Sequence, residues 1–186
     1  MLISDSIHGV IMKSALLIID VQKGLFTPPP ADAEATINRI NSLSTAARRA
    51  GVPVIFIQHQ TPDDELAHGS DAWQIDRRLQ VQDGDHRVEK TTPDSFLRTG
   101  LGPLLVANGV SHLVVCGYSS EFCVDTTTRR AAGLGYPVTL AADAHTSHDK
   151  AHATGQQIRD HHNATLSSIE SFGVLINALP TAEIHF

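Results

Sequence analysis

The sequence predicts a three-layer α/β/α fold whose six-stranded, mostly parallel sheet is doubly wound in the Rossmann-like manner. Short apolar runs rich in β-branched residues alternate with segments whose apolar residues recur at helical spacing. This alternation is typical of strand–helix–strand units. The chain has 186 residues, and domains hold roughly 100 to 200 residues. We therefore expect residues 1–186 to form a single domain, with residues 1–12 as a candidate N-terminal extension before the start-like run MKSALLIID.

The predicted elements follow in chain order. Continuous apolar runs, as in strands buried on both faces, predict strands at residues 14–20, 52–59, 112–118 and 136–142. Shorter candidate strands lie at 87–89 and 173–176. Helical periodicity predicts helices at residues 31–50, 93–108, 123–134 and 149–171. Irregular segments at 26–32 and 60–86 follow the first two strands, and long loops at the carboxyl edge of a parallel sheet commonly carry function.

Composition and charge exclude several classes of function. The formal net charge is −6 and the basic residues are scattered, so we expect no nucleic-acid partner. The apolar runs are far shorter than the ~20 residues that span a bilayer, so we expect no membrane partner. The two cysteines fit a reducing compartment, and the N-terminus lacks the pattern of a secretory signal. We expect a cytoplasmic protein that acts on a small molecule.

Three polar residues stand where predicted strands end. Asp20 closes the run ALLIID, Lys90 closes RVEK, and Cys123 follows the strand HLVVCGY. Each has a common structural explanation on its own: a turn aspartate, a surface lysine and a small core residue, the last of which suits Cys116. Parallel strands bring their carboxyl ends to one edge of the sheet. The combination therefore predicts an acid, a base and a thiol in one site.

The surroundings of Cys123 favour a reactive thiol. One of the two serines before Glu121 is expected to cap a helix, which places the sulfur in its first turn. Helix N-terminal amides and a neighbouring lysine lower a thiol pKa from about 8.5 toward 7, so we expect a thiolate near neutral pH. The aspartate would take the thiol proton and return it to a leaving amine, while the lysine stabilises the thiolate.

Three stretches carry a family resemblance: IIDVQKGLF, VEKTTPDSF and GYSSEFCVDTTTRRAAGLGY. In order and spacing they resemble the signatures of the isochorismatase-like cysteine hydrolases, which include nicotinamidases, N-carbamoylsarcosine amidase and isochorismatases. The resemblance runs from about residue 13 to residue 144. One departure is conservative, because Ser120-Glu121 stands where the family commonly has Thr-Asp.

The resemblance implies specific roles for residues of this chain. It implies a catalytic triad of Asp20, Lys90 and Cys123 on a six-stranded parallel sheet. It also implies a cis peptide bond between Tyr118 and Ser119, with an oxyanion hole formed by the backbone N–H groups of Ser119 and Cys123. A homo-oligomer, either a dimer or a tetramer, is implied as well. The apolar tail 174–186 is a candidate contact between subunits, or else an edge strand packed within one subunit.

Side chains near the predicted triad are candidates for substrate binding. Gln22 lies two residues after Asp20 on the same side of an extended segment, so we expect it to orient that carboxylate. Trp73 lies in the second long loop and is either a loop anchor or a wall of the pocket. The full set of expected substrate-binding residues is Gln22, Phe26, His59, Trp73, Phe96 and Tyr118.

The eleven histidines raise the question of a metal. Adjacent His161 and His162 diverge by about 100° on a helix, whereas a metal needs convergent ligands. The segment IQHQTPDDELAH has no Asp-x-His pair of the kind found in nicotinamidases. We therefore expect no metal and no cofactor, and assign most histidines to the surface or to structure, with His59 as the exception that faces the pocket.

Three hypotheses for function follow. The leading one is a metal-independent cysteine hydrolase that cleaves a C–N bond of a small amide through a thioester. The second is vinyl ether hydrolysis of an isochorismate-like substrate, which the retained Cys123 disfavours because the resemblance implies that some isochorismatases dispense with the cysteine. The third is a catalytically silent binding or thiol-sensing protein, against which intact Asp20 and Lys90 weigh.

Overall fold

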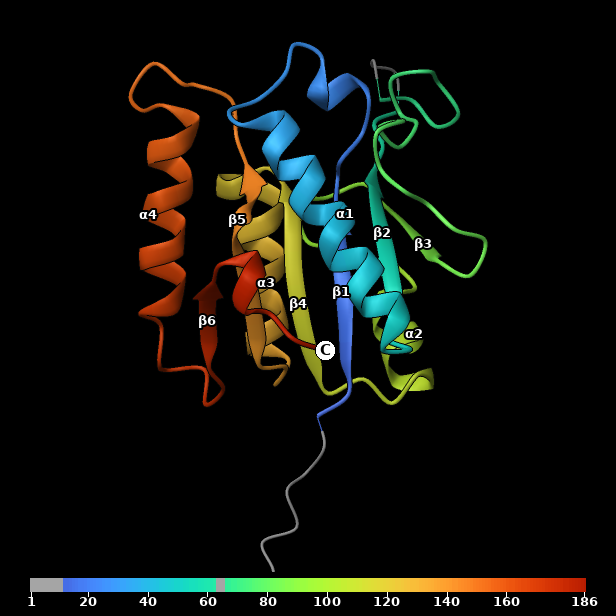
Figure 1. Ribbon diagram of the computed structural model, residues 1–186, viewed down its shortest axis with the longest axis vertical. Helices are drawn as coiled ribbons and strands as arrows, with labels where there is room; N and C mark the ends of the chain where they lie inside the picture. Colours follow the sequence, from blue (N-terminus) through green and yellow to red (C-terminus); the bar gives the residue numbers. More distant parts are fainter. Residues whose placement is uncertain (1–11, 63–65) are drawn as a thin grey trace, which may run out of the picture.

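The fold is built on one parallel sheet with helices on both faces (Figure 1). The computed structural model describes residues 12–62 and 66–186, so the candidate extension lies outside the described residues apart from Met12. The strand order is β3-β2-β1-β4-β5-β6, and all neighbouring strands pair in parallel. The strands are β1 (Ser14–Ile19), β2 (Val54–His59), β3 (His86–Lys90), β4 (His112–Tyr118), β5 (Val138–Thr146) and β6 (Ile176–Leu179). This order confirms the predicted doubly wound sheet, whose chain direction across the sheet reverses between β1 and β4.

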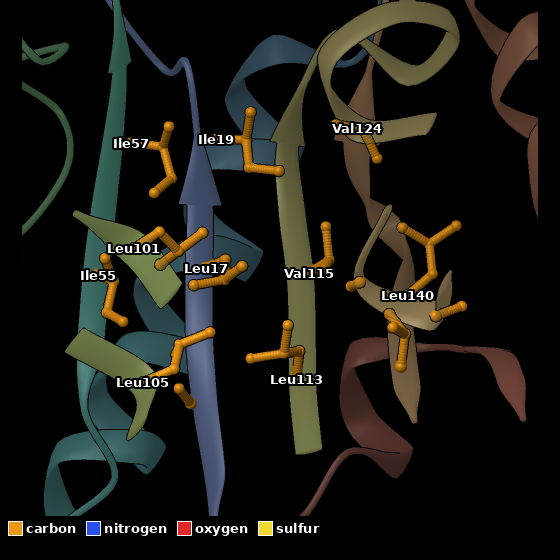
Figure 2. Packing of buried hydrophobic residues seen from close by; sticks show 14 of the residues in the cluster. Leu17, Ile19, Ile55, Ile57, Leu101, Leu105, Leu113, Val115, Val124 and Leu140 are labelled. Atoms are coloured by element: carbon orange, nitrogen blue, oxygen red, sulfur yellow. The ribbon is translucent and has the colours of Figure 1, made fainter. Parts of the chain in front are cut away.

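The helices divide between the two faces of the sheet. They are α1 (Ala33–Arg49), α2 (Leu101–Ala107), α3 (Asp125–Gly133) and α4 (Gly155–Ser167), with short turns η1 (Gly24–Phe26), η2 (Ser120–Val124) and η3 (Thr181–Glu183). Helix α1 covers one face, while α2, α3 and α4 cover the other. Alternate residues of β1 serve the two cores, because successive side chains of a strand point to opposite faces. Leu17 and Ile19 enter the core shown in Figure 2, and Leu16 and Ile18 enter the core under α1.

Two predicted helices are shorter than expected. The helix predicted at 93–108 begins only at Leu101, because residues 93–100 form turns in which the Asp94 carboxylate accepts from the Phe96 amide at 2.8 Å. Such side-chain bonds to the backbone compete with helix formation. The helix predicted at 149–171 spans Gly155–Ser167, since a capping box joining Thr154 and Gln157 fixes its start.

The last two strands also differ from expectation. Strand β5 extends to Thr146, beyond the predicted end at residue 142, and β6 spans Ile176–Leu179 rather than residues 173–176. Part of the C-terminal tail packs on the chain itself, because β6 pairs with β5 and Ile184 is buried in the core under α1. A contact between subunits through the tail stays a prediction. Among the residues that the structure describes, no helix is long and apolar enough to cross a bilayer.

Candidate active site

The three residues at strand ends lie in contact at the carboxyl edge of the sheet, the upper edge in Figure 1. Asp20 follows β1, Lys90 ends β3, and Cys123 lies in η2, directly after β4. The Lys90 ammonium donates to Asp20 Oδ2 at 2.6 Å and to Cys123 Sγ at 3.2 Å. The predicted convergence of acid, base and thiol is therefore present, on both sides of the point where the strand order reverses.

The fold explains how residues from separated strands meet. Strand β3 is two strands away from β1, so the long Lys90 side chain must reach across the end of β2. Asp20 has φ 50, a left-handed conformation that aspartate adopts more readily than most residues. Its amide still donates to the Ile57 carbonyl at 3.0 Å, so the turn stays tied to β2. Both side chains are almost fully buried, at 0% exposure for Lys90 and 1% for Asp20.

The site departs from expectation in the state of the thiol. Burial, followed by the nearby Asp20 carboxylate, raises the pKa of Cys123 to about 12, and the Lys90 ammonium opposes this only in part. This direction runs against the expectation of a thiolate near neutral pH and favours a protonated sulfur in the resting site. Asp20 Oδ1, which has no hydrogen-bond partner among the described residues, is the free oxygen of the neighbouring carboxylate.

The turn that carries Cys123 is also different from the predicted capped helix. Residues Ser120–Val124 form a π-helical turn, and the α-helix begins only at Asp125. No serine side chain caps it. Ser119 makes no capping hydrogen bond, and Ser120 Oγ instead bonds His145 Nδ1 at 2.7 Å. The cis peptide bond expected between Tyr118 and Ser119 is present.

Gly117 allows β4 to run close to β1 directly before this turn. Its φ is +117, and a Cβ built there would lie 2.1 Å from the Ile19 carbonyl oxygen. No side chain fits at that distance, so only glycine is compatible with the approach. The register between β4 and β5 also shifts between Val115 and Gly117. Sequence reasoning singled out neither the glycine nor the shift.

A buried chain of hydrogen bonds behind the π-helical turn was also not predicted from the sequence. The Asn163 amide donates to the Ala142 carbonyl at 2.9 Å, which leaves its oxygen to accept from His145 Nε2, also at 2.9 Å. His145 Nδ1 is then an acceptor, so the Ser120 hydroxyl donates to it. Ser120 and His145 are fully buried. The polar run DAHTS after residue 142 was the available signal, but the strand was predicted to end before it.

The expected substrate-binding residues fall into different places. His59 lies next to the triad, with Nδ1 3.2 Å from Lys90 Nζ. Gln22 is fully buried and bonds the backbone of His59 and Trp73 rather than the Asp20 carboxylate. Trp73 is 7% exposed and its carbonyl accepts from the Gln22 amide, which fits the loop-anchor alternative.

Of the candidates Phe26, Tyr118 and Phe96, the first two are in contact and the third lies apart. The Phe26 ring meets Tyr118 edge-on at 5.9 Å, and the Tyr118 hydroxyl bonds His148 Nδ1 at 2.9 Å. Phe96 instead stacks at 6.1 Å on Tyr136, which precedes β5 near the opposite edge of the sheet. A cavity of about 560 Å³ between η1 and the loop 71–78 is lined by Phe26 but not by the triad.

The donor atoms of Asp20, His59 and Cys123 lie within 4.8 Å of one another. Oxygen, nitrogen and sulfur together suit zinc. Lys90 Nζ, however, bonds all three side chains, so the lysine already supplies the positive charge that such a set attracts. We therefore do not assign this cluster as a metal site, and the absence of a metal stays a prediction.

Comparisons with known proteins give the family. The isochorismatase domain model matches residues 14–177. Streptothricin hydrolase from Streptomyces noursei is 39% identical over 138 residues, which are 73% of this chain and 50% of the relative. For a second streptothricin hydrolase from the same organism, the match covers 62% of the relative's length. The chain thus spans less than two thirds of these relatives. Nicotinamidase 3 from Arabidopsis thaliana is 30% identical over 70% of this chain and 72% of its own length. A crystal structure of an isochorismatase family protein aligns with TM-score 0.82 and 36% identity over 90% of this chain and 98% of that one.

Proposed function

Because the chain belongs to the isochorismatase family of hydrolases, we propose that it cleaves the C–N bond of a small amide by cysteine catalysis. The observation that carries the proposal is the single ammonium of Lys90, which bonds both the Asp20 carboxylate and the Cys123 sulfur. A thiol, a buried base and a fixed cation are the parts that acyl transfer through a thioester requires. The relatives named streptothricin hydrolase and nicotinamidase support hydrolysis as the reaction class.

Acylation begins with the proton on Cys123. Asp20 takes that proton on its unpaired Oδ1 while the sulfur attacks the amide carbon and forms a C–S bond. The backbone N–H groups of Ser119 and Cys123 receive the negative oxygen of the tetrahedral intermediate. Asp20 then gives its proton to the nitrogen, the C–N bond breaks, and ammonia or an amine leaves.

Deacylation uses the same groups in reverse order. Asp20 takes a proton from water as the water oxygen attacks the thioester carbon. The C–S bond breaks, the acid leaves, and the proton returns from Asp20 to the sulfur. The Lys90 ammonium keeps its positive charge throughout the cycle. At each step it stabilises whichever of Asp20 and Cys123 is anionic.

The raised pKa of Cys123 makes this proton transfer necessary. A raised thiol pKa favours the protonated sulfur, so the proposed attack is coupled to deprotonation by Asp20. The site therefore resembles a nucleophile activated by an adjacent base rather than a preformed thiolate. Steady-state turnover should accordingly depend on Asp20 as the base.

The proposal is tested by ammonia release from a panel of primary amides. Cys123→Ala should lower turnover by about 10³-fold or more, because it removes the nucleophile. Cys116→Ala is the matched control, since Cys116 is fully buried in β4 and its sulfur donates only to the Leu17 carbonyl. Mass spectrometry of quenched wild-type reactions should show an acyl group on Cys123.

Two outcomes contradict the proposal. Unchanged amide turnover by Cys123→Ala would exclude thioester chemistry. Pyruvate release from an isochorismate-like vinyl ether, undiminished in the same variant and without turnover of any amide, would favour the vinyl ether alternative.

A further inference from the structure

We infer that His59 is a positioning residue for Lys90: its Nδ1 accepts the third N–H of the ammonium and so holds the lysine between Asp20 and Cys123. This inference rests on the proposed function, which gives Lys90 its role. It differs from the expectation for His59, which was contact with the substrate.

The hydrogen-bonding capacity of Lys90 carries the first step. An ammonium has three N–H donors and no acceptor, and a buried donor without a partner is destabilising. The Lys90 side chain is 0% exposed, so water does not reach it. Its three acceptors are Asp20 Oδ2 at 2.6 Å, His59 Nδ1 at 3.2 Å and Cys123 Sγ at 3.2 Å. Without His59, one buried N–H would lose its partner and the ammonium would be free to shift.

The position of His59 is set by the fold independently of any substrate. The Gln22 side chain donates to the His59 carbonyl at 2.9 Å and accepts from the His59 amide at 2.8 Å. His59 and Lys90 are also register partners in the β2–β3 ladder. Two backbone hydrogen bonds and one strand pairing therefore place the imidazole beside the ammonium.

The contact also fixes the protonation state of His59. Because an ammonium can only donate, His59 Nδ1 must carry a lone pair. The groups that face the imidazole among the described residues are the Lys90 ammonium from β3, the Asp20 carboxylate after β1, the Thr92 backbone carbonyl after β3 and the Cys123 thiol from η2. No other residue of β2 is charged.

These neighbours favour the neutral imidazole. Burial, and then the Lys90 charge, lower the pKa of His59, and Asp20 and Thr92 oppose this to a smaller extent. A proton on Nδ1 would remove the acceptor and place a second positive charge against the ammonium. Turnover should therefore fall as the pH drops through the lowered pKa of His59.

Two substitutions separate positioning from other roles. His59→Asn places an amide oxygen close to the position of Nδ1 and does not titrate, whereas His59→Leu offers no acceptor. We expect His59→Leu to lower kcat by about 100-fold, the effect of a misplaced catalytic group, with KM little changed. We expect His59→Asn to keep kcat within about tenfold of wild type. In this variant the part of the fall in kcat at low pH that comes from His59 should be absent.

A second readout needs no substrate. Alkylation of Cys123 by iodoacetamide, followed by mass spectrometry across pH, reports how well Lys90 stabilises the thiolate, with fully buried Cys116 as the internal control. His59→Leu should slow alkylation at neutral pH by about tenfold, and His59→Asn should restore it. Circular dichroism checks that each variant is folded. If His59→Leu does not fold, the inference is tested by His59→Asn alone, through its pH profile of kcat and its rate of Cys123 alkylation.

The outcomes keep this inference separate from the proposed function. Wild-type values of kcat and alkylation in His59→Leu would overturn the inference. A raised KM with unchanged alkylation in both variants would also overturn it, in favour of contact with the substrate, and so would a loss in His59→Asn as large as that in His59→Leu. If no amide is turned over but alkylation of Cys123 depends on His59 as expected, the proposed function fails and the positioning role stands.

Discussion

At the scale of single residues, histidine side chains join segments that are distant in the sequence. His145 uses both ring nitrogens, toward Ser120 in η2 and Asn163 in α4. His148 bonds the Tyr118 hydroxyl and also the backbone of the loop after η1. A neutral imidazole has one donor and one acceptor, so it can connect two groups of opposite character. His145 and His148 therefore have structural roles, whereas the assignment of most histidines to the surface or to structure stays a prediction.

The burial of His145 predicts a pH-dependent stability. Burial lowers the pKa of His145 from 6.5 to about 4. In the unfolded chain the imidazole binds a proton below pH 6.5, while in the folded chain it stays neutral until about pH 4. The associated stability is therefore fully present above pH 6.5 and is lost as the pH falls toward 4. The loss should reach about 3 kcal/mol.

Urea unfolding at pH 7 and at pH 4.5 checks this prediction. His145→Gln has no titrating group at this position, so the difference in unfolding free energy between wild type and variant should shrink by about 2 to 3 kcal/mol between the two pH values. A difference that stays constant with pH would show that the buried imidazole does not resist protonation. His112, whose pKa is also lowered by burial, is present in both proteins and cancels from the comparison.

Whether the position of a site residue could be predicted from the sequence depends on what determines that position in the fold. Asp20 and Lys90 could be placed because each stands at the end of a predicted strand, and parallel strands end at a common edge. Phe96 and Gln22 could not, since their partners, Tyr136 and the backbone of His59, are set by tertiary packing. The sequence suggested a lowered pKa for Cys123, whereas burial raises that pKa and the nearby lysine opposes this only in part; burial depends on the whole fold.

At the scale of elements, the end of β4 depends on one glycine. Gly117→Ala would force a Cβ to 2.1 Å from the Ile19 carbonyl oxygen at a φ of +117. Backbone atoms of two central strands cannot separate without disturbing the sheet, so we expect a loss of more than about 3 kcal/mol of unfolding free energy. Urea denaturation measures this loss.

A matched glycine controls for the general effect of the substitution. A Cβ at Gly84, in the loop before β3, meets nothing within 4 Å and its φ is not in the left-handed range. Gly84→Ala should therefore change stability by less than about 1 kcal/mol. Equal effects of the two substitutions would mean that the close approach of β4 to β1 is not strongly constrained.

Element boundaries show what local signals can determine. The central strands β1, β2 and β4 were predicted within two residues of their observed ends, because both of their faces are buried and their apolar runs are continuous. The start of α4 was predicted six residues early, although the capping box of Thr154 and Gln157 is readable in the sequence. The turns at residues 93–100 depend on side-chain bonds that periodicity does not reveal.

At the scale of the whole molecule, the strand order explains why the site lies where it does. The order of the sheet reverses between β1 and β4, and ligands of doubly wound sheets bind at such a point. Asp20 follows β1, Cys123 lies in η2 after β4, and Lys90 reaches both from β3. The sequence predicted parallel strands but not their spatial order. The homo-oligomer implied by the resemblance stays a prediction, and the packed β6 favours an intrasubunit role for this part of the tail.

The ion pair between Lys90 and Asp20 should also contribute to the stability of the whole sheet. Lys90 and Asp20 come from β3 and the end of β1, and both side chains are at most 1% exposed. Lys90→Met leaves a buried carboxylate without its counter-ion, and breaking a buried pair in this way typically destabilises by about 3 to 5 kcal/mol. Adding Asp20→Asn removes the uncompensated charge, so the double variant should recover a large part of the loss although it is inactive. Urea unfolding of the wild type, of Lys90→Met, of Asp20→Asn and of the double variant, at pH 7, gives the coupling energy. If Lys90→Met is as stable as the wild type, the pair serves the chemistry without holding the strands together.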